Sequence, residues 1–204
     1  MTLTAKAEST RGAILAAGED LILAKGFTGV GLQQILTACG VPKGSFYHYF
    51  SSKEGFGVAV LERYVETYLE AVEGLLSGMG SPTGTTGTGA TARDRLRMLG
   101  DAWAGHAGEA SADRCLVVKL AAEVSSFSEP MRLALADGVA RLVALMAGVV
   151  AEGQQDGSIT SPCPAAELAE SLYELWLGAA LLDRISRDGT PFVSALRTTS
   201  LLLD

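Results

Sequence analysis

Apolar residues recur at three- and four-residue intervals along most of the chain, which is the spacing of one face of an α-helix. The first such segment covers residues 10–25, and Gly26 follows it as a possible C-terminal cap. A second segment covers residues 32–39 and stops at Gly40. A third begins at Pro42, whose missing N–H does no harm in a first helical turn. The pattern predicts three helices before residue 51.

Longer apolar repeats follow, and they too have the helical period. The first runs from about residue 53 to 76 and begins at "SSKE", where Ser51 and Glu54 are spaced for a capping box. Residues 77–91 are dominated by Gly and Thr, so we expect a flexible connection there. Beyond it the pattern predicts helices at about 91–108, 113–127, 130–153, 164–187 and 191–203. The chain is therefore predicted to be all-α, with about nine helices.

Composition limits the classes of protein that fit. The chain has 204 residues, of which 48% are apolar, enough for one large domain or a small one joined to a larger one. It shows no signal peptide and no run of eighteen uncharged apolar residues. We therefore expect a soluble, cytoplasmic protein with no membrane partner. Its three cysteines, Cys39, Cys115 and Cys163, match neither a disulfide framework nor a zinc spacing, and we expect reduced thiols, no metal and no cofactor.

The formal net charge of −7 argues at first against nucleic acid as a partner. The charge is unevenly distributed, however. Residues 1–55 carry five basic and four acidic side chains, a net charge of +1, which leaves −8 for residues 56–204. The N-terminal quarter is therefore electrostatically distinct from the rest, and the objection is weakened.

The two short helices at 32–39 and 42–50 form a helix-turn-helix pattern around Gly40 and Val41. With 100° per residue, the second helix has an apolar side that packs inward, formed by Phe46, Tyr49 and Phe50. Its other side is more exposed and carries no acid; it consists of Lys43, Gly44, Ser45, Tyr47 and His48. Such a face suits a phosphate-lined groove. The alternative is that Tyr47 and His48 are ordinary residues at the edge of a core.

The run "GVPKGSFYHYFSSKE" resembles the DNA-binding head of the TetR family of transcriptional repressors, and the resemblance extends over residues 10–64. It implies a helix-turn-helix domain at 1–52 and a helical effector-sensing and dimerisation domain at 53–204. It also implies that the helix starting near Pro42 enters the major groove of an operator. The residues expected to contact DNA are Thr28, Gln33, Lys43, Gly44, Ser45, Tyr47, His48 and Lys53. Gly31 departs from the family, which often has Thr or Ser as the cap before the second helix.

A symmetric dimer would place two recognition helices about 34–36 Å apart on a palindromic operator. The segment 164–187 has apolar residues on two adjacent stripes, more than the core of one protomer easily covers. Together with the segment 191–203 it is predicted to form a four-helix bundle across a two-fold axis. The alternative is that helix 164–187 is simply central to its own core.

The stretch "DRCLVVKLAAEVSSFSEPMR" resembles one branch of the family, the repressors that respond to electrophiles such as N-ethylmaleimide. The resemblance implies that Cys115 senses the effector. Arg114 is adjacent and Lys119 lies one helical turn on, and both cations would favour a thiolate. The alternative is that Cys115 is a buried core residue beside an apolar stripe, which comprises Leu116, Leu120, Val124 and Phe127.

The sequence leaves two other modes of action open. A non-covalent effector pocket between the helices at 91–150 would involve residues such as Met98, Trp103, His106 and Met146. A thiol-dependent enzyme would need a base for Cys115, but the chain has only His48 and His106, and no third group is placed to orient either. We therefore expect a regulator and no catalytic residues.

Overall fold

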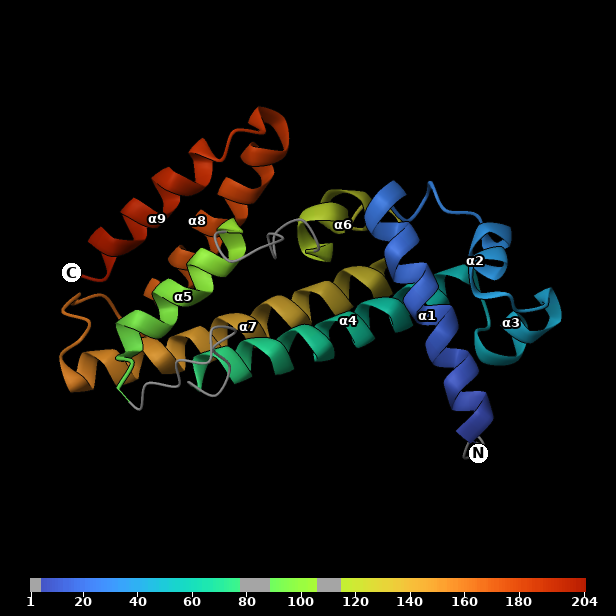
Figure 1. Ribbon diagram of the computed structural model, residues 1–204, viewed down its shortest axis with the longest axis horizontal. Coiled ribbons are helices and arrows are strands. Elements are labelled where there is room, and N and C mark those ends of the chain that lie inside the picture. The colour runs from blue at the N-terminus through green and yellow to red at the C-terminus, as the bar shows by residue number, and fades with distance from the viewer. Residues whose placement is uncertain (1–4, 78–88, 106–114) are drawn as a thin grey trace. The chain divides into compact units, whose positions relative to one another are not determined.

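The computed structural model describes residues 5–77, 89–105 and 115–204 (Figure 1). Within these ranges the chain forms only helices and no strand, so the predicted all-α class is confirmed. The expected loop at 77–91 falls mostly outside the described residues, as do Arg114 and His106. The helices are α1 (Ala5–Lys25), α2 (Leu32–Cys39), α3 (Lys43–Tyr49), α4 (Lys53–Leu76), α5 (Ala92–Ala104), α6 (Leu116–Val124), α7 (Glu129–Asp156), α8 (Ala165–Ser186) and α9 (Thr190–Leu202).

The described chain divides into two compact units. The first unit comprises Met1–Thr67 and Lys119–Gly138, and the second comprises Tyr68–Val118 and Val139–Asp204. The helices α4, α6 and α7 each begin in one unit and end in the other.

The core of the first unit is built around aromatic rings from α3 and α4. Phe46 and Phe56 are fully buried and Phe50 is nearly so; the ring centroids of Phe46 lie 5.2 Å from Phe50 and 5.5 Å from Phe56. Gly18 on α1 faces this cluster, and a Cβ atom at that position would lie 2.2 Å from the Phe56 ring. A side chain there would therefore push α1 off the aromatic cluster. This packing holds the buried side of α3 in place.

The second unit contains α5, α8 and α9, and Figure 1 shows α8 and α9 as a pair with α5 beside them. Its core holds both tryptophans, and the ring centroids of Trp103 and Trp176 lie 6.4 Å apart. The Trp176 indole N–H donates to the Thr199 hydroxyl at 2.9 Å, which satisfies a buried donor. The core of this unit therefore ties α5 and α8 to α9.

Helix α7 passes a length and hydropathy test for a membrane span, with a mean hydropathy of 1.9 over its most apolar window. Core helices of soluble proteins pass the same test. In the first unit α7 packs closely on α4, because a Cβ atom at Gly138 would lie 2.5 Å from the Val65 side chain.

Candidate nucleic-acid interface and sensing site

The turn between α2 and α3 has the geometry that the sequence predicts. Gly40 adopts the left-handed conformation, with φ of 66°, and caps the C-terminus of α2 through its N–H. The Val41 N–H donates to the Leu36 carbonyl at 3.1 Å, which closes the end of the helix. Pro42 then forms the N-cap of α3, and the Ser45 N–H donates to its carbonyl at 2.9 Å. The chain thus passes from α2 to α3 through a short, fully bonded turn.

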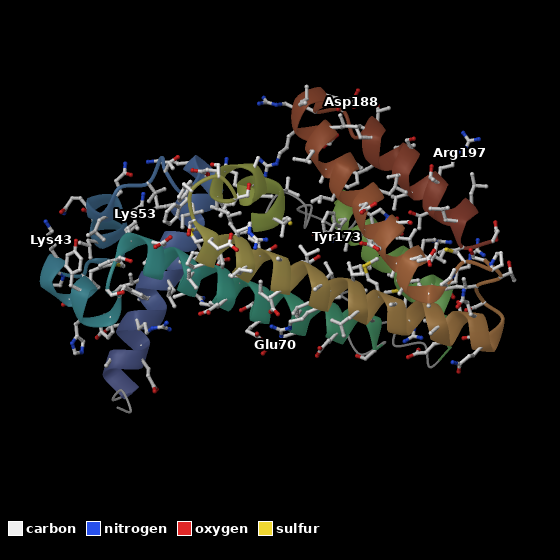
Figure 2. All side chains as sticks on the ribbon, turned by 180° about the vertical axis from the view of Figure 1, so that it is seen from behind. Lys43, Lys53, Glu70, Tyr173, Asp188 and Arg197 are labelled. Atoms are coloured by element: carbon white, nitrogen blue, oxygen red, sulfur yellow. The ribbon has the colours of Figure 1, made fainter. Side chains whose placement is uncertain are left out.

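Helix α3 presents the face that the sequence predicts. Phe46 is completely buried, whereas the next residue, Tyr47, is 56% exposed. Lys43, Gly44 and His48 are also exposed, and Ser45 is half-buried. Figure 2 shows the Lys43 side chain pointing away from α3. Tyr47 and His48 are therefore not sealed inside the protein, although the Tyr47 ring also packs edge-on against Phe46, and their contact with DNA stays a prediction.

The N-terminus of α2 replaces the usual hydroxyl cap by another contact. Gly31 has no side chain to accept a hydrogen bond, but its own N–H donates to the Gln34 side-chain oxygen at 3.0 Å. Gln33 is exposed at the start of this helix. Helix α2 therefore begins where the sequence predicts although Gly31 replaces the usual Thr or Ser cap, and Gln33 stays accessible.

Thr28 and Lys53 make contacts inside the first unit that the sequence does not suggest. The Glu123 carboxylate accepts from the Thr28 N–H at 2.6 Å and from its hydroxyl at 2.5 Å. The Lys53 ammonium donates to the Phe27 carbonyl at 2.8 Å and lies 4.6 Å from the centroid of the Phe27 ring. Glu123 was missed because it lies about 95 residues from its partners, and no local pattern distinguishes it from other surface glutamates.

The charges of this group influence one another. Burial lowers the pKa of Lys53, and the negative charge of Glu123 offsets part of that effect. Burial would raise the pKa of Glu123, but the hydrogen bonds from Thr28 and Phe27 and the charge of Lys53 outweigh it. The pKa of Glu123 therefore lies below its ordinary value, and the carboxylate is ionised at neutral pH.

Cys115 lies in the second unit, immediately before α6, and is only 3% exposed. The expected stripe beside it is buried at Leu116, Leu120 and Val124, but Phe127 is 48% exposed and stacks on Phe27 of the first unit instead. Lys119 is half-buried. Cys39, Cys115 and Cys163 all lie in described segments and form no disulfide in this structure. Among the described side chains, no group of His, Cys, Asp and Glu is placed to hold a metal ion.

Two tyrosine hydroxyls are close enough to Cys115 to interact with its charge. Burial raises the pKa of Tyr68, and an ionised Cys115 raises it further. Burial also raises the pKa of Tyr173, and the charge of Cys115 again adds to the effect. The Trp103 indole N–H donates to the Tyr68 hydroxyl at 2.7 Å, and the Trp103 ring packs edge-on against Tyr173. Both phenols are therefore uncharged at neutral pH. Tyr173 is labelled in Figure 2.

The residues predicted to line a non-covalent pocket are only partly accessible. Trp103 and Met146 are buried, with exposures of 1% and 0%, and Met98 is half-buried. His106 lies outside the described residues.

Comparison with known proteins places both parts of the chain in one family. Residues 14–60 match the model described as "Bacterial regulatory proteins, tetR family", and residues 92–199 match "Tetracyclin repressor-like, C-terminal domain". The HTH-type transcriptional repressor NemR of Escherichia coli K12 is 41% identical over 192 residues, which are 92% of this chain and 90% of that protein. The transcriptional regulator AcuR of Cereibacter sphaeroides is 32% identical, over 91% of this chain and 81% of that protein.

The structural comparison agrees. The crystal structure of the reduced form of Escherichia coli NemR superposes with a TM-score of 0.83 and 40% sequence identity, covering 94% of this chain and 95% of that one. The helix-turn-helix and the helical C-terminal part are matched together, so the resemblance covers nearly the whole chain. The chain belongs to the TetR family of transcriptional repressors, which bind an operator as dimers and release it on binding an effector.

Proposed function

We propose that this repressor reads a palindromic operator with the exposed face of α3 and senses reactive electrophiles covalently at Cys115. The observation that carries the first part is the split of α3 into a buried aromatic side and an exposed side without acids. In this proposal residues 1–52 form the DNA-binding head and residues 53–204 form the sensing and dimerisation part. The protein works in the cytoplasm as a regulator and has no enzymatic activity.

The exposed residues of α3 divide between backbone and base contacts. The Lys43 ammonium is suited to a phosphate, and the Tyr47 hydroxyl and His48 ring are suited to phosphates or base edges. Gly44 allows close backbone approach, and Ser45 and Gln33 supply short polar contacts. Lys53 has three N–H donors and uses one on Phe27, so it can also reach a phosphate. The donors of Thr28 are engaged by Glu123, which leaves its hydroxyl oxygen as an acceptor.

The dimer is proposed to form through α8 and α9. Their apolar residues Leu181, Leu182 and Ile185 are 47%, 58% and 80% exposed, and Val193 and Leu201 are 64% and 67% exposed. The first three follow Gly178 at helical spacing, and a Cβ atom at Gly178 would meet nothing within 4 Å. A small residue next to large apolar ones lets another helix approach closely. A second copy of this chain would cover both sets of residues.

The chemistry at Cys115 is addition of a thiolate to an activated double bond. With N-ethylmaleimide, the sulfur forms a bond to one alkene carbon, the π electrons move toward the carbonyl, and the neighbouring carbon takes a proton from solvent. The product is a thioether, and no oxidant or reductant is needed. Because Cys115 is only 3% exposed, the adduct does not fit the packing around it. It therefore favours a different arrangement of the chain, which lowers the affinity for DNA.

The test combines DNA release with peptide mapping. An operator fragment is found by mobility shift with DNA flanking the protein's own gene, and the complex is treated with N-ethylmaleimide or a quinone. We expect release in step with one adduct at Cys115. The Cys115→Ser variant should bind the fragment normally and resist release, whereas Cys39→Ser and Cys163→Ser should respond like the wild type. Release of Cys115→Ser by the same compound would instead support the non-covalent pocket, and catalytic turnover of the compound would support an enzyme.

A further inference from the structure

Three hydrogen-bond donors from the turn between α1 and α2 converge on one carboxylate. Glu123, near the end of α6, accepts from the Phe27 N–H at 3.1 Å, the Thr28 N–H at 2.6 Å and the Thr28 hydroxyl at 2.5 Å. The Phe27 donor contacts one carboxylate oxygen, and both Thr28 donors contact the other. All of these residues belong to the first compact unit. The turn is therefore bound to α6 by charge-assisted hydrogen bonds.

The same turn is also held by α4. Lys53 donates to the Phe27 carbonyl and lies over the Phe27 ring, and its charge attracts Glu123. The Phe127 ring, just beyond α6, stacks on Phe27 with centroids 5.8 Å apart and an angle of 18° between the planes. We call Phe27, Thr28, Lys53 and Glu123 the clasp. It connects α4 and α6 to the residues that lead directly into α2.

The sequence at the turn is adapted to this carboxylate. Gly26 has a φ of 79°, and a Cβ atom there would lie 2.9 Å from a Glu123 carboxylate oxygen. Any other residue at position 26 would thus be strained and would displace Glu123. The next residues of the turn are anchored as well, because Val30 is completely buried.

We propose that Glu123 is a positioning residue for operator binding, which holds the turn so that α2 and α3 meet the DNA at the correct angle. Glu123 does not itself contact DNA. It lies eight residues after Cys115, about 12 Å along a helix at 1.5 Å per residue. An adduct at Cys115, the residue before α6, is proposed to disturb the start of this helix and thereby to weaken the clasp near its end. This second step rests on the proposed sensing role of Cys115.

The main test replaces Glu123 by Gln in the full-length protein. A carboxamide keeps the size but offers one acceptor oxygen, and its NH₂ group then faces a donor of Phe27 or Thr28. The matched control is Glu129→Gln, because Glu129 is an ionised glutamate whose bonds, among the described residues, go to Arg132 three residues further along α7 and not to the turn. Operator affinity is measured by fluorescence anisotropy, folding by denaturant unfolding, and release by the ratio of affinities with and without N-ethylmaleimide.

For Glu123→Gln we expect a folded dimer with operator affinity lowered within the range of about 5- to 150-fold that is typical of coupled sites. Its release ratio should move toward one, since the clasp is already open. Glu129→Gln should match the wild type in both measurements. If Glu123→Gln does not fold, Phe127→Ala serves instead, because Phe127 is 48% exposed and its loss spares the core. It should change affinity in the same direction by a smaller factor.

Unchanged affinity in a folded Glu123→Gln protein would overturn the proposal. A lower unfolding midpoint with unchanged affinity and release ratio would also overturn it, because Glu123 would then be a structural residue only. If N-ethylmaleimide fails to release the wild type, the proposed sensing role of Cys115 fails. The affinity measurements without the compound still decide whether Glu123 positions the head.

Discussion

The Lys53 ammonium donates a hydrogen bond to the Phe27 carbonyl oxygen at 2.8 Å. This bond joins the start of α4 to the turn after α1, and the cation also lies over the Phe27 ring. The resemblance to the family implies a phosphate contact for Lys53, and here part of its bonding capacity serves the interior of the first unit. Two roles for this residue therefore have to be separated by experiment.

Replacing Lys53 by Met separates them, because Met keeps the aliphatic stem and loses the charge and the donors. If Lys53 also neutralises a phosphate, the slope of log affinity against log salt should fall by about one. If it acts only through Phe27, affinity should fall with the slope unchanged. We expect the first result, measured by anisotropy between 50 and 200 mM salt, the range over which such slopes are resolved. An unchanged slope would remove Lys53 from the DNA-contacting residues.

The stability of the protein should depend on pH through Glu123. The pKa of Glu123 in the folded protein lies below its ordinary value of 4.5, so its contribution is fully present above that pH. It is lost as pH falls through the folded-state pKa. We expect the difference in unfolding free energy between wild type and Glu123→Gln to be positive at pH 6 and to shrink below pH 4.5. A difference that stays constant down to pH 3 would contradict the ionised clasp.

The aromatic cluster should account for much of the stability of the DNA-binding unit. Phe46→Ala removes a fully buried ring that packs on Phe50 and Phe56, and should lower the unfolding free energy by about 3–5 kcal/mol. The neighbouring Tyr47→Ala removes an exposed ring and should cost about 1 kcal/mol or less. Denaturant unfolding of both variants checks this. Equal losses of unfolding free energy would contradict a buried Phe46 side and an exposed Tyr47 side of α3.

Periodicity predicted the helices well where a helix has a clear stop. The bounds of α2 and α4 agree with the predicted ranges, because Gly40 ends α2 and α4 follows a polar turn. Helix α1 begins at Ala5 instead of residue 10, since nothing in the preceding sequence breaks a helix. Helix α5 ends at Ala104 instead of 108, because Gly105 takes a left-handed conformation with φ of 79° and caps it.

Details that depend on side-chain choice or on distant segments were not predictable. Ser52 caps the first turn of α4, accepting from the Gly55 N–H at 2.9 Å, where the sequence suggested Ser51. Glu54, the predicted partner in that cap, accepts instead from the Ser128 hydroxyl. Glu123 is a similar case, since its partners come from a turn about 95 residues away. Local patterns carry no information on such pairs, whereas the exposed face of α3 follows directly from 100° per residue.

The exposed face of α3 should control operator affinity without affecting folding. Lys43→Ala and Tyr47→Ala should each weaken operator binding about tenfold. Lys43→Ala should also lower the slope of log affinity against log salt by about one. Arg97→Ala is a suitable control, because Arg97 is an exposed cation on α5 in the other unit. Operator affinity is measured by fluorescence anisotropy, and stability by denaturant unfolding, for the two α3 variants and the Arg97→Ala control. Wild-type affinity in both α3 variants would exclude this face as the DNA-reading surface.

The exposed apolar residues of α8 should determine the oligomeric state. Ile185→Asp places a charge at a position that is 80% exposed in the single chain and is proposed to be buried in the dimer. Burying an unpaired carboxylate is unfavourable by several kcal/mol, so the variant should be monomeric at micromolar concentration and should lose tight operator binding. Gln155→Asp adds the same charge at an exposed polar position near the end of α7, away from α8 and α9, and should leave the dimer intact. Sedimentation velocity distinguishes the species; a dimeric Ile185→Asp protein would move the interface away from this end of α8.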